Sequence, residues 1–324
     1  ILFFIAFIAA FASKDRQPII KDWRVYIFYL LWLLFLLSTA NAMVPWAAWP
    51  KLIEVSKIYL PLILTLWLID TREKLFYLII TIAGSFGLIA AKGGIWAIGS
   101  GFSHRVYGPP TSQFYENNAF AIAVLMTIPL LILWRRETTN QWIRYGLAGA
   151  IPLSFAAALS SWSRGALLTM AVLAIVLIWD SKRKYLVIPL MCLGIYLALG
   201  QLPEEWFSRM HTIKSYEEDA SASGRLTAWR DGYQYALGHP LLGAGFEGWR
   251  HVTRRDWHSS YIEILAEHGF IAFTMWCSLL FGTIISLTRL NITASKFPEI
   301  TWIKNYTTML RASLIAYATG TVFL

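Results

Sequence analysis

Apolar runs long enough to cross a bilayer as helices recur along almost the whole chain. A helix needs roughly 17 to 22 mostly apolar residues to span the hydrocarbon core. We count about ten such segments, near residues 1–12, 25–42, 51–70, 74–91, 119–134, 145–159, 165–180, 185–201, 267–288 and 308–324. A signal peptide would account for one of them but not for the series, so the pattern predicts an all-α, polytopic transmembrane bundle.

The composition agrees with this prediction, because 57% of the residues are hydrophobic and only 15% are charged. The first apolar segment is short and does not begin with Met, so we expect the natural N-terminal start to be missing. Cys192 and Cys277 both fall inside predicted helices and imply no disulfide framework.

The net charge of +9 is explained by membrane topology rather than by nucleic-acid binding. Positive residues mark the cytoplasmic side of a membrane protein. They gather in alternate connections, as Lys14, Arg16, Lys21, Arg24, Arg72, Lys74, Arg135, Arg136, Arg144, Lys182, Arg183, Lys184, Arg289, Lys296 and Lys304. The short connections between these hold only Lys51, Lys92, Arg105 and Arg164. The outward loops are therefore predicted at residues 43–50, 92–118, 160–164 and 202–262.

The chain accordingly divides into the first eight transmembrane helices (1–201), one long outward loop (202–262) and the last transmembrane helices (263–324). The loop is rich in aromatic residues, which indicates a folded cap rather than a disordered linker. Arg225, Trp229 and Tyr233 recur at steps of four, on one face of a predicted interfacial helix. The following G-H-P-L-L-G-A-G-F at 238–246 predicts a turn or a dip toward the membrane surface.

Arg164 stands where neither topology nor helix electrostatics favours a positive charge. It follows Ser163, a natural N-cap, in the short outward turn S-S-W-S-R-G-A. A cation in the first turn of a helix meets the positive end of the helix dipole. A bound anion would compensate, because N-terminal amides and a guanidinium together bind phosphate. The alternative is that Arg164 extends to lipid headgroups.

Arg225 repeats this arrangement, because it follows Gly224 at the start of its own predicted helix. Two such arginines on the outer face suit a diphosphate better than a single carboxylate, and the membrane context suggests a lipid diphosphate. Asn117 and Asn118 enter another helix from an outward loop. They are expected either to bind sugar hydroxyls or to cap that helix.

Residues 254–269, R-R-D-W-H-S-S-Y-I-E-I-L-A-E-H-G, place many titratable side chains directly before an apolar run. Glu263 and Glu267 share a helical face, where Glu263 either orients His258 or faces water. Glu267 and His268 suggest a capping or interhelical pair. A zinc site from His251, Asp256, His258 and His268 is an alternative without the usual ligand spacing.

Taken in order, S-W-S-R-G-A, G-R-L-T-A-W-R, H-P-L-L-G-A-G-F and H-S-S-Y-I-E-I-L-A-E-H-G resemble the O-antigen ligase and polymerase superfamily. With Y-G-P-P-T-S-Q-F-Y-E-N-N-A-F-A at 107–121, they are similar in particular to the O-glycosylation ligases associated with exosortase systems. The resemblance covers roughly residues 107–275 and rests on the order and spacing of motifs that are individually weak.

The resemblance implies a multi-pass enzyme of the bacterial inner membrane whose active site is periplasmic, with residues 202–262 as the catalytic loop. It implies an undecaprenyl-diphosphate-linked glycan as donor and a hydroxyl of lipid A–core or of a protein as acceptor. No metal and no cofactor is implied. The family's histidine corresponds to His258, which opens a pattern that Gly269 closes, although Ser259 and Ile262 depart from the usual Asn and Leu.

The catalytic residues are therefore expected to be His258, as base, with Arg164 and Arg225, which would also bind the donor diphosphate. Further substrate-binding residues are expected to be Arg230, Asn117, Asn118, Glu263, Trp257 and Tyr261. Membrane lipids complete the expected partners. A polymerase of the same superfamily is the near alternative. A transporter of a lipid-linked anion is less favoured, because the centres of the predicted helices are almost bare of ionisable residues.

Overall fold

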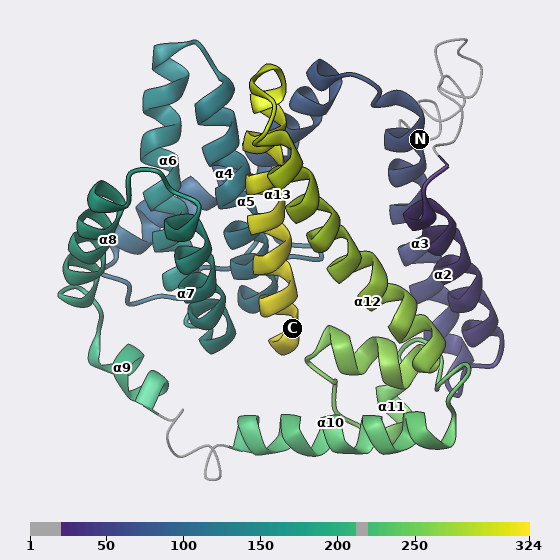
Figure 1. The fold of residues 1–324 in the computed structure, drawn as a ribbon. Coiled ribbons are helices and arrows are strands. Elements are labelled where there is room, and N and C mark those ends of the chain that lie inside the picture. Colours follow the sequence, from purple (N-terminus) through teal and green to yellow (C-terminus); the bar gives the residue numbers. More distant parts are fainter. Residues whose placement is uncertain (1–20, 212–219) are drawn as a thin grey trace. The chain divides into compact units, whose positions relative to one another are not determined.

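The computed structural model describes residues 21–211 and 220–324, in which every regular element is a helix. The span expected at residues 1–12 lies outside the described residues. In chain order the helices are α2 (Trp23–Ala40), α3 (Pro45–Leu68), α4 (Arg72–Gly99), α5 (Asn117–Glu137), α6 (Gln141–Leu159), α7 (Arg164–Trp179), α8 (Lys184–Leu199), α9 (Glu204–His211), α10 (Ala220–Gly238), α11 (Trp249–Val252), α12 (Ser260–Ala294) and α13 (Thr301–Gly320) (Figure 1). The all-α prediction is confirmed.

The described residues contain fewer candidate membrane spans than the apolar segments counted in the sequence. Five described helices are long and apolar enough to cross a membrane, namely α2, α4, α5, α6 and α12, or six if the bent pair α8 and α9 forms one span. The segment near 51–70 falls in α3, which carries Lys51, Glu54 and Lys57. Helices α7 and α8 each contain only 16 residues. The apolar runs therefore located the helices, whereas length and composition select only some of these helices as candidate membrane spans.

The helix boundaries follow from local sequence. Asp22 caps α2 by accepting from the Arg24 amide at 2.9 Å, and the Arg24 guanidinium hydrogen-bonded to it lowers the pKa of that carboxyl to about 2. Pro45 occupies the first position of α3, where its missing N–H costs nothing. Helix α4 continues to Gly99, so the outward loop expected from residue 92 begins later.

The chain forms two compact units. Unit 1 combines Ile1–Leu78 with Ser221–Gly282, and unit 2 combines Ile79–Ala220 with Thr283–Leu324. The cap expected at 202–262 is consequently divided, because α9 belongs to unit 2 whereas α11 and nearly all of α10 belong to unit 1. The long loop does carry helices, as predicted.

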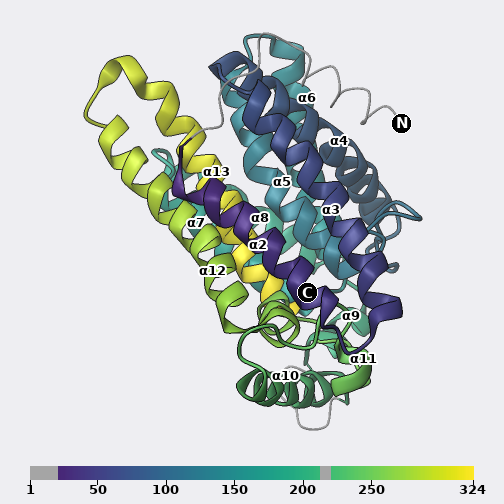
Figure 2. The ribbon, with the colours of Figure 1, turned by 90° about the vertical axis from the view of Figure 1, so that its right-hand side faces the viewer.

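The core of unit 1 joins α2, α3 and the first part of α12. Leu31 and Phe35 of α2 pack with Leu52 of α3, Ala272 of α12 and Phe246, which precedes α11. The views in Figures 1 and 2 show α10 and α11 at the same end of unit 1 as the start of α12. This end carries His258.

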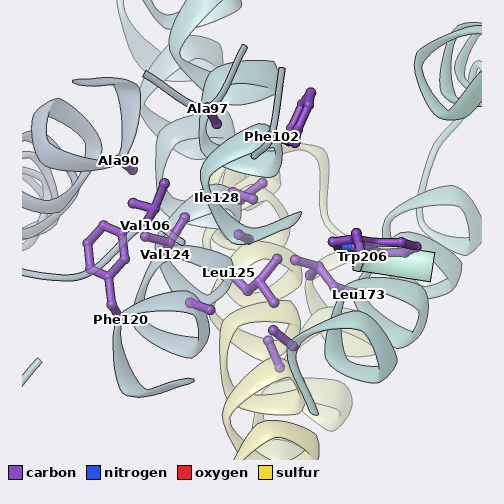
Figure 3. Close-up of a cluster of buried hydrophobic side chains, with 14 of the residues drawn as sticks. Ala90, Ala97, Phe102, Val106, Phe120, Val124, Leu125, Ile128, Leu173 and Trp206 are labelled. Atoms are coloured by element: carbon purple, nitrogen blue, oxygen red, sulfur yellow. The ribbon is translucent and has the colours of Figure 1, made fainter. Parts of the chain in front are cut away.

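Unit 2 is built around α5, whose apolar side chains are almost all buried. Phe120, Val124 and Leu125 of α5 pack with Leu173 of α7 and with Trp206 of α9 in one continuous cluster. Figure 3 shows Phe120 and Val124 on one side of Leu125, and Leu173 and Trp206 on the other. Helix α13 packs against both α5 and α7.

Two polar contacts tie α13 to the ends of its neighbours in unit 2. The Arg311 guanidinium donates to both carboxylate oxygens of Asp180 at 2.7 Å, directly after α7. The Asn305 amide donates to Glu137 at 3.0 Å, at the end of α5. Charged hydrogen bonds between partly buried groups are among the stronger polar contacts, and here they fix the register of α13.

Candidate active site

His258 lies between two anchored residues in unit 1. Trp257 is 0% exposed and Ser259 is 2% exposed, whereas the His258 side chain between them is half-buried. The His258 backbone has a left-handed φ of 47°. This conformation is uncommon for residues other than glycine, and strained backbone of this kind gathers at functional sites. The His258 amide donates to Asp256 at 3.2 Å.

Trp257 is held from three directions. Its indole Nε1–H donates to Oε1 of Glu267 at 3.1 Å, and its carbonyl accepts from the Trp229 indole of α10 at 2.8 Å. Its ring lies against Gly232 of α10, where a Cβ would stand 2.6 Å from the indole. The buried indole leaves no surface for a substrate, so Trp257 is not the wall residue that we expected.

Glu267 and His268 are part of one buried polar network. Both side chains are 1% exposed. Oε1 of Glu267 also accepts from the Gly248 amide at 3.0 Å, and Nδ1 of His268 lies 3.0 Å from Oγ of Ser38 in α2. The Ser38 hydroxyl lies 2.7 Å from the Leu242 carbonyl and 2.8 Å from the Glu267 carbonyl, so His268 is the donor toward Ser38 when Ser38 donates to either.

The predicted turn at 238–246 is confirmed, and it packs on this same part of α12. Gly243 and Gly245 adopt left-handed φ values of 61° and 78°. The Gly245 amide donates to the Glu267 carbonyl at 2.8 Å, and a Cβ on Gly243 would lie 2.5 Å from the Ala266 carbonyl oxygen. Gly269, with φ 78°, interrupts α12 where the Phe270 amide turns to bind the Pro240 carbonyl at 2.8 Å.

The remaining predicted residues of unit 1 lie on α10 and at the start of α12. Helix α10 begins at Ala220, so Arg225 lies in its second turn and not at its N-terminus as expected. Arg230 is exposed and pairs with Asp231 at 3.4 Å. Tyr261 packs edge-on against Trp276 with 5.0 Å between ring centroids. Glu263 is half-buried, and its amide binds the Ser259 carbonyl at 2.8 Å.

In unit 2, Arg164 is the first residue of α7, as predicted. Ser163 caps the helix by accepting from the Ala166 amide at 3.2 Å. Trp162, which precedes Ser163 in this turn, has a left-handed φ of 57°. Arg164 is half-buried, so part of its side chain packs within the fold while part remains accessible to solvent.

The Arg164 turn is fastened by residues distant in sequence. The Asn117 amide, 8% exposed, donates to the Ser161 carbonyl at 2.7 Å. Nε of Arg209 in α9 donates to the Trp162 carbonyl at 3.0 Å. The Arg105 guanidinium lies 5.6 Å from the centre of the Trp162 ring. Three arginines therefore lie on or beside one short turn, and sequence reasoning identified only Arg164.

Asn117 and Asn118 do not cap α5, which was one of the two expectations for them. Glu116 is the N-cap residue, and Asn117 is the first residue of the helix. Asn118 is half-buried and donates to Glu116 at 2.8 Å. The Asn117 amide is committed to the Ser161 carbonyl, so its contribution to a site would be structural.

The zinc alternative has no support from geometry in the described part of the chain. Residues 21–211 and 220–324 contain no group of three or more His, Cys, Asp or Glu side chains arranged to hold a metal ion. His268, one of the suggested ligands, is enclosed between the rings of Phe35 and Phe246, each with its centroid 4.4 Å away.

Several apolar helices define a polytopic helical membrane protein, in which unit 1 carries His258 with its left-handed backbone and unit 2 carries Arg164 at the start of α7. Residues 149–277 match the family model described as O-Antigen ligase, and residues 1–140 match one described as a family of unknown function (DUF5935). The first match includes Arg164, Arg225 and His258. The match over residues 149–277 supports the resemblance of this part of the chain to the O-antigen ligase superfamily. A comparison with curated proteins gives no match.

Proposed function

We propose that this membrane glycosyltransferase transfers a glycan from an undecaprenyl-diphosphate-type carrier to a hydroxyl acceptor such as lipid A–core or a protein. The observation that carries the proposal is the family match over residues 149–277, which spans Arg164, Arg225 and His258. The strained, doubly anchored backbone of His258 supports a functional role for that residue. The reaction is proposed for the periplasmic face of the bacterial inner membrane.

The chemistry needs one base and stabilisation of one leaving group. A hydroxyl is a poor nucleophile at neutral pH, so His258 accepts its proton as the oxygen attacks the anomeric carbon. The bond from that carbon to the diphosphate breaks, and direct attack inverts the configuration. The leaving diphosphate keeps the bonding electrons, and Arg164 and Arg225 stabilise its charge. The proposed mechanism uses no metal and no cofactor.

The other predicted residues contribute in different ways. Arg230 is exposed and remains a candidate for contact with the donor, and Tyr261 and Glu263 follow His258 on the first turn of α12. Asn118 is half-buried and remains a candidate for sugar hydroxyls. Asn117 and Trp257 support the site from within the fold, because their polar groups are bound to Ser161 and Glu267.

The decisive experiment separates a ligase from a polymerase, which joins donor units to each other. In a strain lacking this protein, the length profile of lipid-linked and acceptor-linked glycan is compared with that of the parent. A ligase predicts loss of attached polymer while lipid-linked polymer is retained. Loss of long lipid-linked polymer would identify a polymerase, and an unchanged profile would contradict both.

A further inference from the structure

Glu267 is a buried acidic residue of unit 1 to which the proposed reaction assigns no role. Its side chain is 1% exposed. A single oxygen, Oε1, accepts from the Gly248 amide at 3.0 Å and from the Trp257 indole at 3.1 Å. Placing a carboxyl group in a protein interior is unfavourable unless hydrogen bonds compensate. The two donors therefore explain how the group is tolerated, but not why an acid occupies this position.

The second donor, the indole of Trp257, belongs to the residue directly before His258. Trp257 is joined to His258 by one peptide bond, and the Trp257 ring and carbonyl are fixed by Gly232 and Trp229 of α10. Ser259, on the other side, is buried and accepts from the Glu263 amide at 2.8 Å. These contacts on both neighbours, together with the bond from the His258 amide to Asp256, hold the left-handed φ of 47° at His258. Among the contacts of Trp257, the indole hydrogen bond is the one made to a buried acid.

We infer that Glu267 is a positioning residue that sets the placement of His258 by holding the indole of Trp257. This inference rests on the proposed function, because that proposal makes His258 the base. What Trp257 requires from Glu267 is a hydrogen-bond acceptor at Oε1 and not a negative charge. A glutamine at this position supplies the same carbonyl acceptor to both donors, whereas an alanine supplies none.

A purely structural role for Glu267 would give a different result. The Ser38 hydroxyl lies 2.8 Å from the backbone carbonyl of the same residue, and 3.0 Å from Nδ1 of His268, but contacts neither Trp257 nor His258. Ser38→Ala therefore loosens the same buried network without releasing the indole. It is the matched control for stability, and its thermal unfolding temperature should fall along with that of Glu267→Ala.

The test uses the full chain in lipid nanodiscs, with a synthetic undecaprenyl-diphosphate-linked disaccharide as donor and purified lipid A–core or a serine-rich peptide as acceptor probes. Release of undecaprenyl diphosphate is measured over a range of donor concentration and pH. We expect Glu267→Ala to lower kcat about 10- to 100-fold with KM changed less than about threefold, because a small displacement of a reacting group has effects of this size. Glu267→Gln and Ser38→Ala should stay within about threefold of the parent kcat.

A double-mutant cycle tests the route through the indole. Trp257→Phe removes the N–H donor, and its effect on kcat should not add to that of Glu267→Ala, because both changes break one contact. The pH profile of Glu267→Ala should keep its shape at a lower plateau.

Three outcomes would overturn the inference: full kcat in Glu267→Ala, an equal loss in Glu267→Gln, or an equal loss in Ser38→Ala. The second would indicate that Glu267 itself exchanges a proton. His258→Ala is measured in parallel. If His258→Ala retains transfer activity, the proposed function is wrong. If His258→Ala is inactive and Glu267→Ala is fully active, only the positioning role of Glu267 is wrong.

Discussion

The side-chain amide of Asn117 donates to the backbone carbonyl of Ser161 at 2.7 Å, although the two residues are 44 positions apart. The amide belongs to the first residue of α5, and the carbonyl lies in the turn that presents Arg164 at the start of α7. This contact makes Asn117 a support for the candidate site, and it leads to the first prediction.

Asn117→Ala should destabilise the protein and reduce turnover, because it leaves the Ser161 carbonyl without this donor beside Arg164. Loss of a buried partner costs about 1–3 kcal/mol. Asn118→Ala is the control for stability, since its bond to Glu116 is solvent-exposed and should be worth little. The thermal unfolding temperatures of the two purified variants are compared, and donor turnover is measured for Asn117→Ala against the parent. Equal unfolding temperatures of the two variants would contradict the supporting role of Asn117.

Arg164→Lys and Arg225→Lys should each lower turnover roughly tenfold or more, because a lysine ammonium does not reproduce the two parallel hydrogen bonds of a guanidinium to a phosphate. The measurements are initial rates and donor affinity. Arg144→Lys, at an exposed position of α6 on the predicted cytoplasmic side, should behave like the parent. If Arg164→Ala changed neither rate nor affinity, the argument that an anion compensates this charge would be wrong.

His258→Ala should abolish transfer while leaving expression and donor binding intact. The rates of the parent and of the variants are compared over a range of pH. His268→Ala should be milder in rate, although it opens a buried site beside Ser38. His251→Ala, at an exposed position, serves as the control. Full activity of His258→Ala across the pH range would remove His258 from the mechanism.

Gly232→Ala should destabilise unit 1 and slow transfer. Its Cβ would stand 2.6 Å from the Trp257 ring and 2.9 Å from Ile262, and overpacking a tight core costs about 1–3 kcal/mol. Gly238→Ala, at the end of the same helix, meets no heavy atom within 4 Å and should leave the unfolding temperature unchanged or slightly raised. A stability ranking in the opposite order would show that the ring is not packed on α10 at this point.

Cysteines introduced at Lys182 and Gln201 should react with an impermeant thiol reagent from opposite sides of sealed cells. These positions flank α8, and the alternating positive charge predicts Lys182 inside and Gln201 outside. The native thiols are replaced first by Cys192→Ser and Cys277→Ser, because Cys192 is exposed. Labelling of both introduced cysteines from one side would refute the predicted topology and the periplasmic placement of residues 202–262.

The sequence predicted the features that depend on neighbouring residues. Apolar runs located the helices, Ser163 located the start of α7, and G-H-P-L-L-G-A-G-F located the turn before α11. It also identified Arg164 as unusual from its charge and position, and His258 through motifs that resemble the family. Local propensity and helix capping act over a few residues, so a single sequence contains them.

Other expectations failed where the outcome depended on residues farther apart along the chain. Arg225 was assigned to a helix N-terminus because Gly224 resembles a boundary, yet α10 starts at Ala220. Fewer of the described helices qualify as candidate spans than the apolar runs suggested, because an apolar run does not fix the length at which its helix ends. The loop at 202–262 was expected to be one cap, but its helices divide between two units.

By itself, the sequence determined that the chain is helical and where most of its helices lie, since these follow from the spacing of apolar residues and from caps. It also singled out His258 and the turn of Arg164. Only the tertiary structure decided which distant groups hold them: Glu267 binds the indole of Trp257, and Asn117 binds the carbonyl of Ser161. A side-chain hydrogen bond requires two groups within about 3 Å in a suitable orientation, and that proximity is created by packing of helices that the chain order does not specify.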